Sequence, residues 1–100
     1  MPGRTVLAAL LLFAAGHAMA AGDVAQGRAT AQRWCATCHA VEPTGRGADV
    51  APSFVTIAQR RDIDYLRGFL SRPHPPMPRF ELSRQDIDDL IAFIESQKPQ

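Results

Sequence analysis

The sequence contains only two cysteines in 100 residues, which excludes a fold held together by several disulfides. A bridge between Cys35 and Cys38 would close a very short loop and would constrain the unfolded chain very little. A chain of this length also buries only a modest core, and such chains commonly depend on a metal or a large ligand. The two thiols are therefore candidates for chemistry rather than for a structural bridge.

Long hydrophobic runs are also lacking. The longest, residues 6–15, falls well short of the ~20 residues that a membrane-spanning helix needs. Arg4 precedes this run and a small-x-small sequence follows it at residues 18–20, which is the pattern of a cleaved secretory signal peptide. We therefore expect residues 1–20 to be a signal peptide, with a retained membrane anchor as the alternative. Residues 21–100 should form one periplasmic domain, which is not an integral membrane protein after cleavage.

Neither sign of charge dominates the sequence, since it has 11 Lys and Arg residues against 10 Asp and Glu residues. Loss of Arg4 with the signal peptide would leave the mature chain formally neutral. This balance indicates neither a nucleic-acid-binding surface nor a polybasic membrane patch.

Helical spacing of apolar residues dominates the mature chain, and no run alternates long enough to predict a strand. Asp23 is the predicted N-cap of the first helix, and Ser83 with Asp86 forms a capping-box pattern before the last helix. Pro73 ends the middle helix, because it disfavours a helical conformation at Arg72. The predicted elements are helices over residues 23–38, 62–70 and 83–97, with one short helical turn after Pro52.

The apolar stripes of these helices predict the core of an all-α fold. The side chains expected to face it are Val24, Gly27, Ala31, Trp34, Cys35 and Cys38 in the first helix, Ile63, Leu66, Phe69 and Leu70 in the middle helix, and Ile87, Leu90, Ile91 and Ile94, with Phe93 beside them, in the last.

The sequence CATCH at residues 35–39 carries the clearest chemical signal. On a helix, Cys35 and Cys38 lie on the same side and can present sulfur to neighbouring points of one flat partner, with His39 directly behind them. C-x-x-C-H is the signature of covalent haem attachment, with two thioether bonds and the imidazole on the iron.

Three alternatives to haem remain open for this motif. A passive disulfide leaves His39 unexplained. A redox-active dithiol would call for a βαβ pattern, which the chain lacks. Zinc needs three or four ligands, and the adjacent Cys38 and His39 rarely reach one tetrahedral ion together.

Four of the residues 73–78 are proline, which excludes a regular helix and predicts a stiff, extended loop around Met77. Met1 and Met19 lie in the signal peptide, so Met77 is the only thioether of the mature chain. The prolines reduce the freedom of the loop before ligation, which favours Met77 as the second axial ligand of iron. The alternatives are a core methionine and ligation by His74 instead.

On these motifs, the chain resembles the small monohaem class I c-type cytochromes over residues 22–97. The resemblance rests on the helix ending in CATCH, a loop with Pro52, the Pro76-Met77-Pro78 loop and a closing helix. It implies the cytochrome c fold, in which three to five helices wrap around one haem c bound covalently through Cys35 and Cys38. His39 and Met77 would be the iron ligands. The Pro52 carbonyl would accept a hydrogen bond from the His39 ring and orient it.

The family also crosses its first and last helices at a glycine and an aromatic ring, which Gly27 and residues 90–93 match. Four positions after the glycine the family often has an aromatic residue, where this chain has Ala31. We therefore expect a looser or shifted crossing. The residues expected to pack around the haem edge are Trp34, Phe54, Leu66, Phe69 and Phe80.

Iron with both axial positions filled has no vacancy for oxygen or peroxide, which favours electron transfer over catalysis. We expect a one-electron carrier, not an enzyme, that serves periplasmic or membrane redox proteins such as a dehydrogenase, an oxidase or another cytochrome. It would be a monomer or a subunit of a complex. The alternatives are a dedicated haem c subunit of a periplasmic dehydrogenase, and a haem sensor or peroxidase from which Met77 dissociates.

Charged residues near the loops are candidates for contact with haem propionates or an acidic partner, or are solvated surface groups. They are Arg46, Arg72 and Arg79, with Tyr65 as a candidate hydrogen-bond donor. The last helix should carry an acidic side formed by Asp86, Asp88, Asp89 and Glu95.

Overall fold

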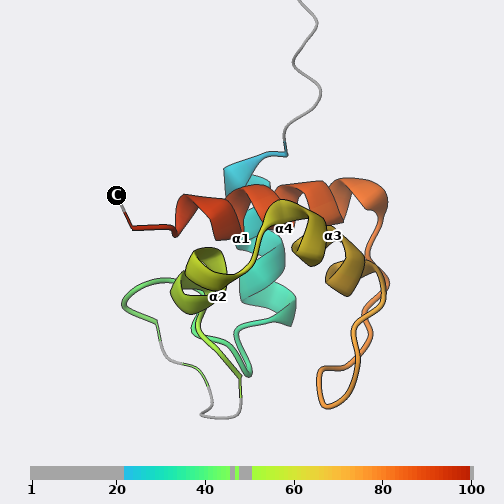
Figure 1. Ribbon diagram of the computed structural model, residues 1–100, viewed down its shortest axis with the longest axis horizontal. Helices are drawn as coiled ribbons and strands as arrows, with labels where there is room; N and C mark the ends of the chain where they lie inside the picture. Colours follow the sequence, from blue (N-terminus) through green and yellow to red (C-terminus); the bar gives the residue numbers. More distant parts are fainter. Residues whose placement is uncertain (1–21, 46, 48–50, 100) are drawn as a thin grey trace, which may run out of the picture.

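The computed structural model describes residues 22–45, 47 and 51–99, and four helices lie within them (Figure 1). They are α1 (Val24–Trp34), α2 (Phe54–Arg60), α3 (Ile63–Ser71) and α4 (Arg84–Ser96). These ranges contain no strand, and the all-α prediction is confirmed. The predicted signal peptide, residues 1–20, lies outside the described residues. None of the helices described is long and apolar enough to cross a membrane.

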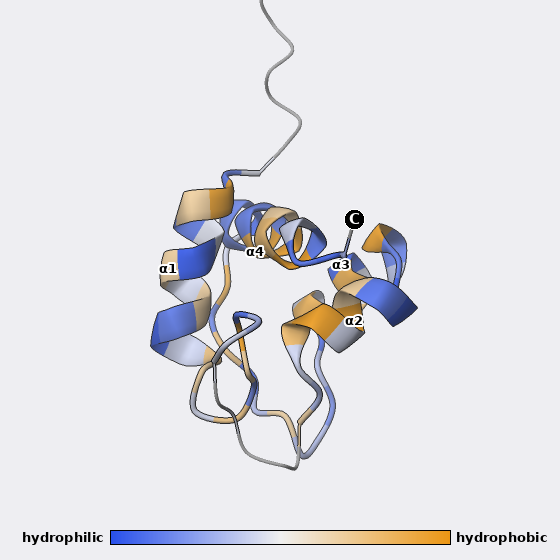
Figure 2. Ribbon diagram, turned by 90° about the vertical axis from the view of Figure 1, so that its left-hand side faces the viewer, coloured by the Kyte–Doolittle hydropathy of each residue, from blue (hydrophilic) through white to orange (hydrophobic). Residues whose placement is uncertain are grey.

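The other three helices all pack against α4. Figures 1 and 2 show that the loops following α1 and α3 both extend from the end of the molecule opposite α4. The cysteine motif precedes the first of these loops, and the proline-rich segment forms the second. The two sequence features that carry the chemistry therefore lie at the same end of the fold.

Each helix is preceded by an N-cap residue whose side chain accepts a hydrogen bond from a backbone amide of the first turn. These amides have no partner within the helix, so the cap satisfies them. The pairs are Asp23 with Gln26, Ser53 with Thr56, Asp62 with Tyr65, and Ser83 with Asp86. The predicted N-cap at Asp23 and the capping box at Ser83 and Asp86 are confirmed. The helix after Pro52 is longer than the single turn predicted: it spans seven residues, and the Ser53 side chain caps its start.

The crossing of α1 and α4 lies at Gly27. A Cβ at this position would overlap the carbonyl of Asp89 and would lie 2.8 Å from the Cβ of Phe93, so the approach requires glycine. Ala31, one turn later, is 0% exposed. The expectation of a looser crossing is wrong, because the close approach at Gly27 brings the backbones of α1 and α4 into contact. The Arg28 guanidinium lies over the Phe93 ring, with its carbon 5.5 Å from the ring centroid.

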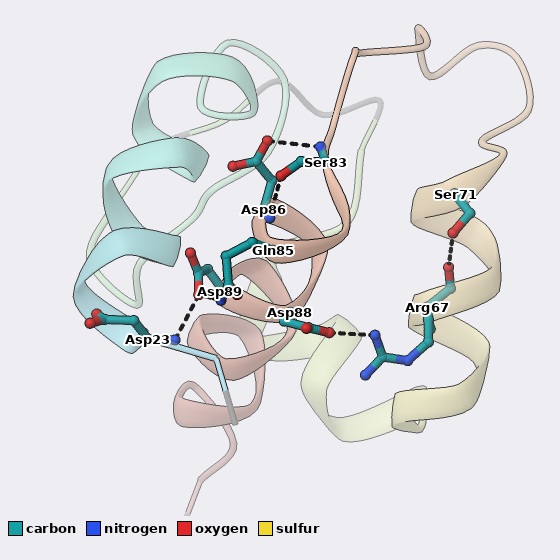
Figure 3. Close-up of polar contacts among 8 residues, drawn as sticks. All are labelled: Asp23, Arg67, Ser71, Ser83, Gln85, Asp86, Asp88 and Asp89. Carbon is teal, nitrogen blue, oxygen red and sulfur yellow. Dashed lines mark hydrogen bonds and ion pairs between the residues drawn. The ribbon is translucent and has the colours of Figure 1, made fainter. Parts of the chain in front are cut away.

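Asp89 is a buried carboxylate that ties the start of α1 to α4. Its Oδ1 accepts hydrogen bonds from the Asp23 backbone amide and from the Gln85 side-chain amide, both at 2.8 Å (Figure 3). A buried carboxylate is costly unless it is hydrogen-bonded, so these two donors are what allow Asp89 to lie in the crossing.

The acidic side predicted for α4 does not form one surface, because its carboxylates have separate local partners. Asp86 caps the helix, and Asp88 pairs with Arg67 of α3 (Figure 3). Glu95 lies 3.5 Å from the Lys98 ammonium. With Asp89 buried, little of the expected negative patch remains.

The core forms where α4 faces the other helices. Three predicted members are exposed. Val24 at 42% and Ile63 at 45% are each the first residue of a helix and precede the turns that pack against α4. Trp34 is 48% exposed at the end of α1, where its ring packs on Phe80. The buried apolar residues are Ala31, Cys35, Val41, Phe54, Ala58, Leu66, Ile87, Leu90, Ile91, Phe93 and Ile94.

Replacing Gly27 by alanine should lower the free energy of unfolding by about 1–3 kcal/mol, because the added methyl forces α1 and α4 apart. Denaturant unfolding of the purified protein measures this. Gly68→Ala in α3 is the matched control. Its methyl meets no atom within 4 Å, and it should stabilise the protein by about 0.5–1 kcal/mol through helix propensity alone. Equal effects of the two variants would contradict the close crossing.

Asp89→Ala should lower the free energy of unfolding by about 1–3 kcal/mol, because the Asp23 amide loses its partner. The control is Asp88→Ala, which removes a largely solvated ion pair to Arg67 and should cost about 0–1 kcal/mol. Thermal or denaturant unfolding compares the two. If Asp88 proved the more costly to remove, the stabilising role given to Asp89 would be wrong.

Candidate functional site

The cysteine motif continues α1 as a compact turn. The Cys35 amide still donates to the Ala31 carbonyl at 2.8 Å, so the turn is joined to the helix without a break. The amides of Cys38 and His39 then both donate to the Cys35 carbonyl, at 3.1 and 2.9 Å. The three functional side chains of the motif are thereby held on one turn, positioned by the helix that crosses α4.

Both cysteines are free thiols, and they lie in different environments. Cys35 is buried and Cys38 is half-buried. Burial raises the pKa of the Cys35 thiol from 9.0 to about 11, because the surrounding apolar groups disfavour a thiolate. A redox-active dithiol needs a lowered pKa, so this environment weighs against that alternative. A thioether, which carries no titrating proton, suits the same buried position.

The His39 ring is oriented by the loop that follows it. Its Nδ1 lies 2.6 Å from the Pro52 carbonyl oxygen. A carbonyl can only accept a hydrogen bond, so Nδ1 carries a proton, and in the neutral ring Nε2 is left with a free lone pair. The hydrogen bond implied by the resemblance is present, and it fixes the tautomer in which Nε2 can bind a metal.

Two further contacts hold this loop against the motif. The Phe54 amide donates to the Ala40 carbonyl at 2.9 Å, which closes the loop just behind Pro52. Gly47 packs directly on the backbone, since a Cβ there would lie 2.9 Å from the Cys38 carbonyl oxygen and even closer to His39 and Ala40. Sequence reasoning did not single out Gly47. Its only signal was a glycine in a loop without other regular structure.

An aromatic contact joins the motif to the core. The rings of His39 and Phe54 have centroids 5.4 Å apart, and the Phe54 ring lies 6.0 Å from that of Phe93 at the helix crossing. Phe54 was expected to pack near the cofactor, and it contacts the imidazole itself. The His39 ring thus contacts the core directly, through Phe54.

The proline-rich loop, whose sequence contains Met77, lies at the same end of the molecule as the loop after α1 (Figure 1). Met77 is half-buried, and its amide donates to the His74 carbonyl at 3.1 Å. The Trp34 and Phe80 rings, 5.8 Å apart, join this loop to the end of α1. The structure therefore brings the loop of Met77 next to the helix that carries the motif.

The donor set at this end of the fold fits a haem. Two thiols on one turn can form two thioethers, Nε2 of His39 is available for iron, and Met77 supplies a thioether from a separate loop. A zinc site has no comparable support: in the ranges 22–45, 47 and 51–99, no three His, Cys, Asp or Glu side chains are grouped to hold a metal. His74 is exposed, and its ring packs edge-on against Phe69 of α3.

The candidate partner-contact residues fall in different settings. Arg72 and Arg79 are exposed, whereas Arg46 lies outside the described residues. Tyr65 is exposed on α3, and the Arg61 guanidinium lies over its ring at 4.2 Å from the centroid. The two arginines remain candidates for contact with an acidic group.

Comparison with known proteins gives consistent matches. The family model described as cytochrome c oxidase, cbb3-type, subunit III matches residues 22–94. Cytochrome c-552 of Bradyrhizobium diazoefficiens is 39% identical over 100 residues, covering 96% of this chain and 95% of that protein. A cytochrome c-553-like protein of Synechocystis sp. is 34% identical over 76 residues, covering 75% of this chain and 70% of that protein. No solved structure gives a significant match.

Gly47→Ala should displace the loop that positions His39, because the added methyl would overlap the motif backbone. We expect the Nδ1 proton of His39 to exchange with solvent roughly tenfold faster, which corresponds to about 1.4 kcal/mol of lost protection. Nuclear magnetic resonance of the ring proton measures this rate. Gly68→Ala should leave the rate unchanged. An unchanged rate in Gly47→Ala would show that this glycine does not support the ring.

Proposed function

Because the chain belongs to the c-type cytochrome family, we propose that it is an exported carrier that passes single electrons between redox proteins. The family is one of electron carriers, and its cofactor is haem c, bound covalently. This group supplies an iron that alternates between the ferric and ferrous states without bond rearrangement. The protein supplies attachment, ligands and burial.

We assign attachment to Cys35 and Cys38 and proximal ligation to Nε2 of His39. The observation that carries this assignment is the 2.6 Å contact between His39 Nδ1 and the Pro52 carbonyl oxygen. Donation to a carbonyl makes the imidazole a stronger base and fixes its orientation toward a metal. No structural role of the histidine alone requires that arrangement next to two unpaired thiols.

The second axial ligand in this proposal is Met77. A thioether stabilises ferrous iron relative to a second imidazole, and a filled position leaves substrates no vacancy. The assignment is supported by the half-buried position of Met77 in a loop that contacts α1 through Phe80 and Trp34. These side chains therefore favour a shuttle over a sensor or a peroxidase.

Residues 1–20 have the pattern of a signal peptide, so we place the mature protein in the periplasm. Its partners would be a dehydrogenase, an oxidase or another cytochrome. The match over 95% of cytochrome c-552 favours a small carrier of that kind. The description of the family model as an oxidase subunit favours a second candidate, a haem subunit held in a larger oxidoreductase.

Mass spectrometry and absorption spectra of the exported protein test the proposal. The expected result is one porphyrin per chain, covalently bound, with reversible oxidised and reduced spectra. Bare polypeptide of the correct mature mass would overturn it. Size-exclusion chromatography of the protein after mild extraction then distinguishes a free carrier from a subunit, because only a subunit elutes together with a larger partner.

Met77→Ala should leave the haem attached, open the iron to added ligands and abolish the sulfur-to-iron charge-transfer band of the ferric protein. The reduction potential should fall by on the order of 0.1 V, since axial ligands set haem potentials over a range of roughly 0.8 V. Leu82→Ala, which truncates a half-buried apolar residue following the same loop, is the control and should keep the band. A Met77→Ala spectrum identical to the wild type would remove Met77 from the site.

A further inference from the structure

One side of α3 carries a continuous stack of side chains that ends at the methionine loop. The Tyr65 and Phe69 rings, one turn apart, are nearly parallel, with 9° between their planes and 5.9 Å between their centroids. The Phe69 ring then meets the His74 ring edge-on, at 4.9 Å and 90°. The Arg61 guanidinium covers the far end of the stack, over Tyr65. The stack therefore joins a rigid helix to a residue of the proline-rich loop.

His74 is fixed at its backbone as well as at its ring. Its Nδ1 donates to the Pro75 carbonyl at 3.0 Å, which holds the ring against its own loop. Its carbonyl accepts the Met77 amide at 3.1 Å. His74 thus contacts Phe69 through its ring and Met77 through its backbone carbonyl.

The prolines make this contact to Met77 unusually important for the loop. Proline has no amide proton, so most residues of the segment cannot donate a backbone hydrogen bond. Within residues 73–79, all of them described, the bond from Met77 to His74 is the one backbone hydrogen bond that forms inside the segment. The position of the Met77 backbone therefore depends on the position of His74.

We propose that Phe69 and His74 are positioning residues for Met77, through which α3 holds the thioether sulfur on the iron. The proposal rests on the assignment of Met77 as the axial ligand and adds the residues that set how firmly it is held. In this proposal neither residue would be an iron ligand. Loss of the edge-on contact frees the His74 carbonyl and, with it, the Met77 amide.

The test is a titration of the ferric holoprotein with imidazole, which displaces the thioether and removes the sulfur-to-iron charge-transfer band. His74→Ala and Phe69→Leu should each bind imidazole roughly two- to tenfold more tightly than the wild type, the range expected for loss of one aromatic pair. Because both variants break the same contact, the double variant should show less than the sum of the two effects. Haem attachment, checked by mass, should be unchanged.

Tyr65→Leu is the matched control, since it alters a ring of the same stack one turn further from the loop. It should change imidazole affinity by less than about twofold, even if it lowers the unfolding temperature. A merely structural role for Phe69 and His74 would lower the unfolding temperature and leave the affinity for imidazole unchanged, which overturns the proposal.

Failure of this inference and failure of the ligand assignment give different results. If Met77→Ala abolishes the band while His74→Ala and Phe69→Leu titrate like the wild type, Met77 is the ligand and the positioning proposal is wrong. If the wild type has no such band and Met77→Ala leaves the spectrum unchanged, the assignment of Met77 and the positioning proposal are both wrong.

Discussion

The close approach of α1 to α4 at Gly27 is the constraint on which the remaining structure depends. It fixes the direction of α1, and the cysteine motif is the direct continuation of that helix. The same crossing contains Phe93, whose ring contacts Phe54, which in turn contacts the His39 ring. The position of the His39 imidazole therefore depends on a packing contact two aromatic rings away, and not on the loop alone.

Much of this fold could be predicted from the sequence, because it is encoded in local side-chain chemistry. Asp23, Ser83 and Asp86 act on amides within one helical turn, so their pattern identifies the helix starts. The motif is equally local, since its function depends on a spacing of three residues. The family resemblance supplied the link between His39 and Pro52, which the structure shows as a short contact.

What could not be predicted depends on contacts between distant segments. The burial of Asp89 follows from its bond to Asp23, 66 positions away, and no pattern within α4 reveals it. The approach of Gly47 to the motif likewise needs the path of the whole loop. Ala31 stands where the family often has an aromatic residue, and the loss of that aromatic contact predicts a looser helix crossing. In the structure the Arg28 guanidinium lies over the Phe93 ring instead. The spacing of apolar residues cannot predict such a contact between a charged group and a ring.

The contacts of the Glu42 carboxylate bear on the order in which the two parts of the candidate cofactor site, one around His39 and one around Met77, form during folding. The carboxylate accepts a hydrogen bond from the Gln32 side chain at 2.8 Å and lies 3.6 Å from Nε of Arg28, so the loop after the motif returns to the helix before it. His39 and Pro52 are also close in the sequence, 13 positions apart. The part of the site around His39 is therefore a region of low contact order. The segment that contains Met77 contacts α1 through Trp34 and Phe80, which are more than forty positions apart in the sequence. Closing a short loop costs less conformational entropy than closing a long one. We therefore expect the part of the site around His39 to form early, and the segment that contains Met77 to pack onto α1 afterwards.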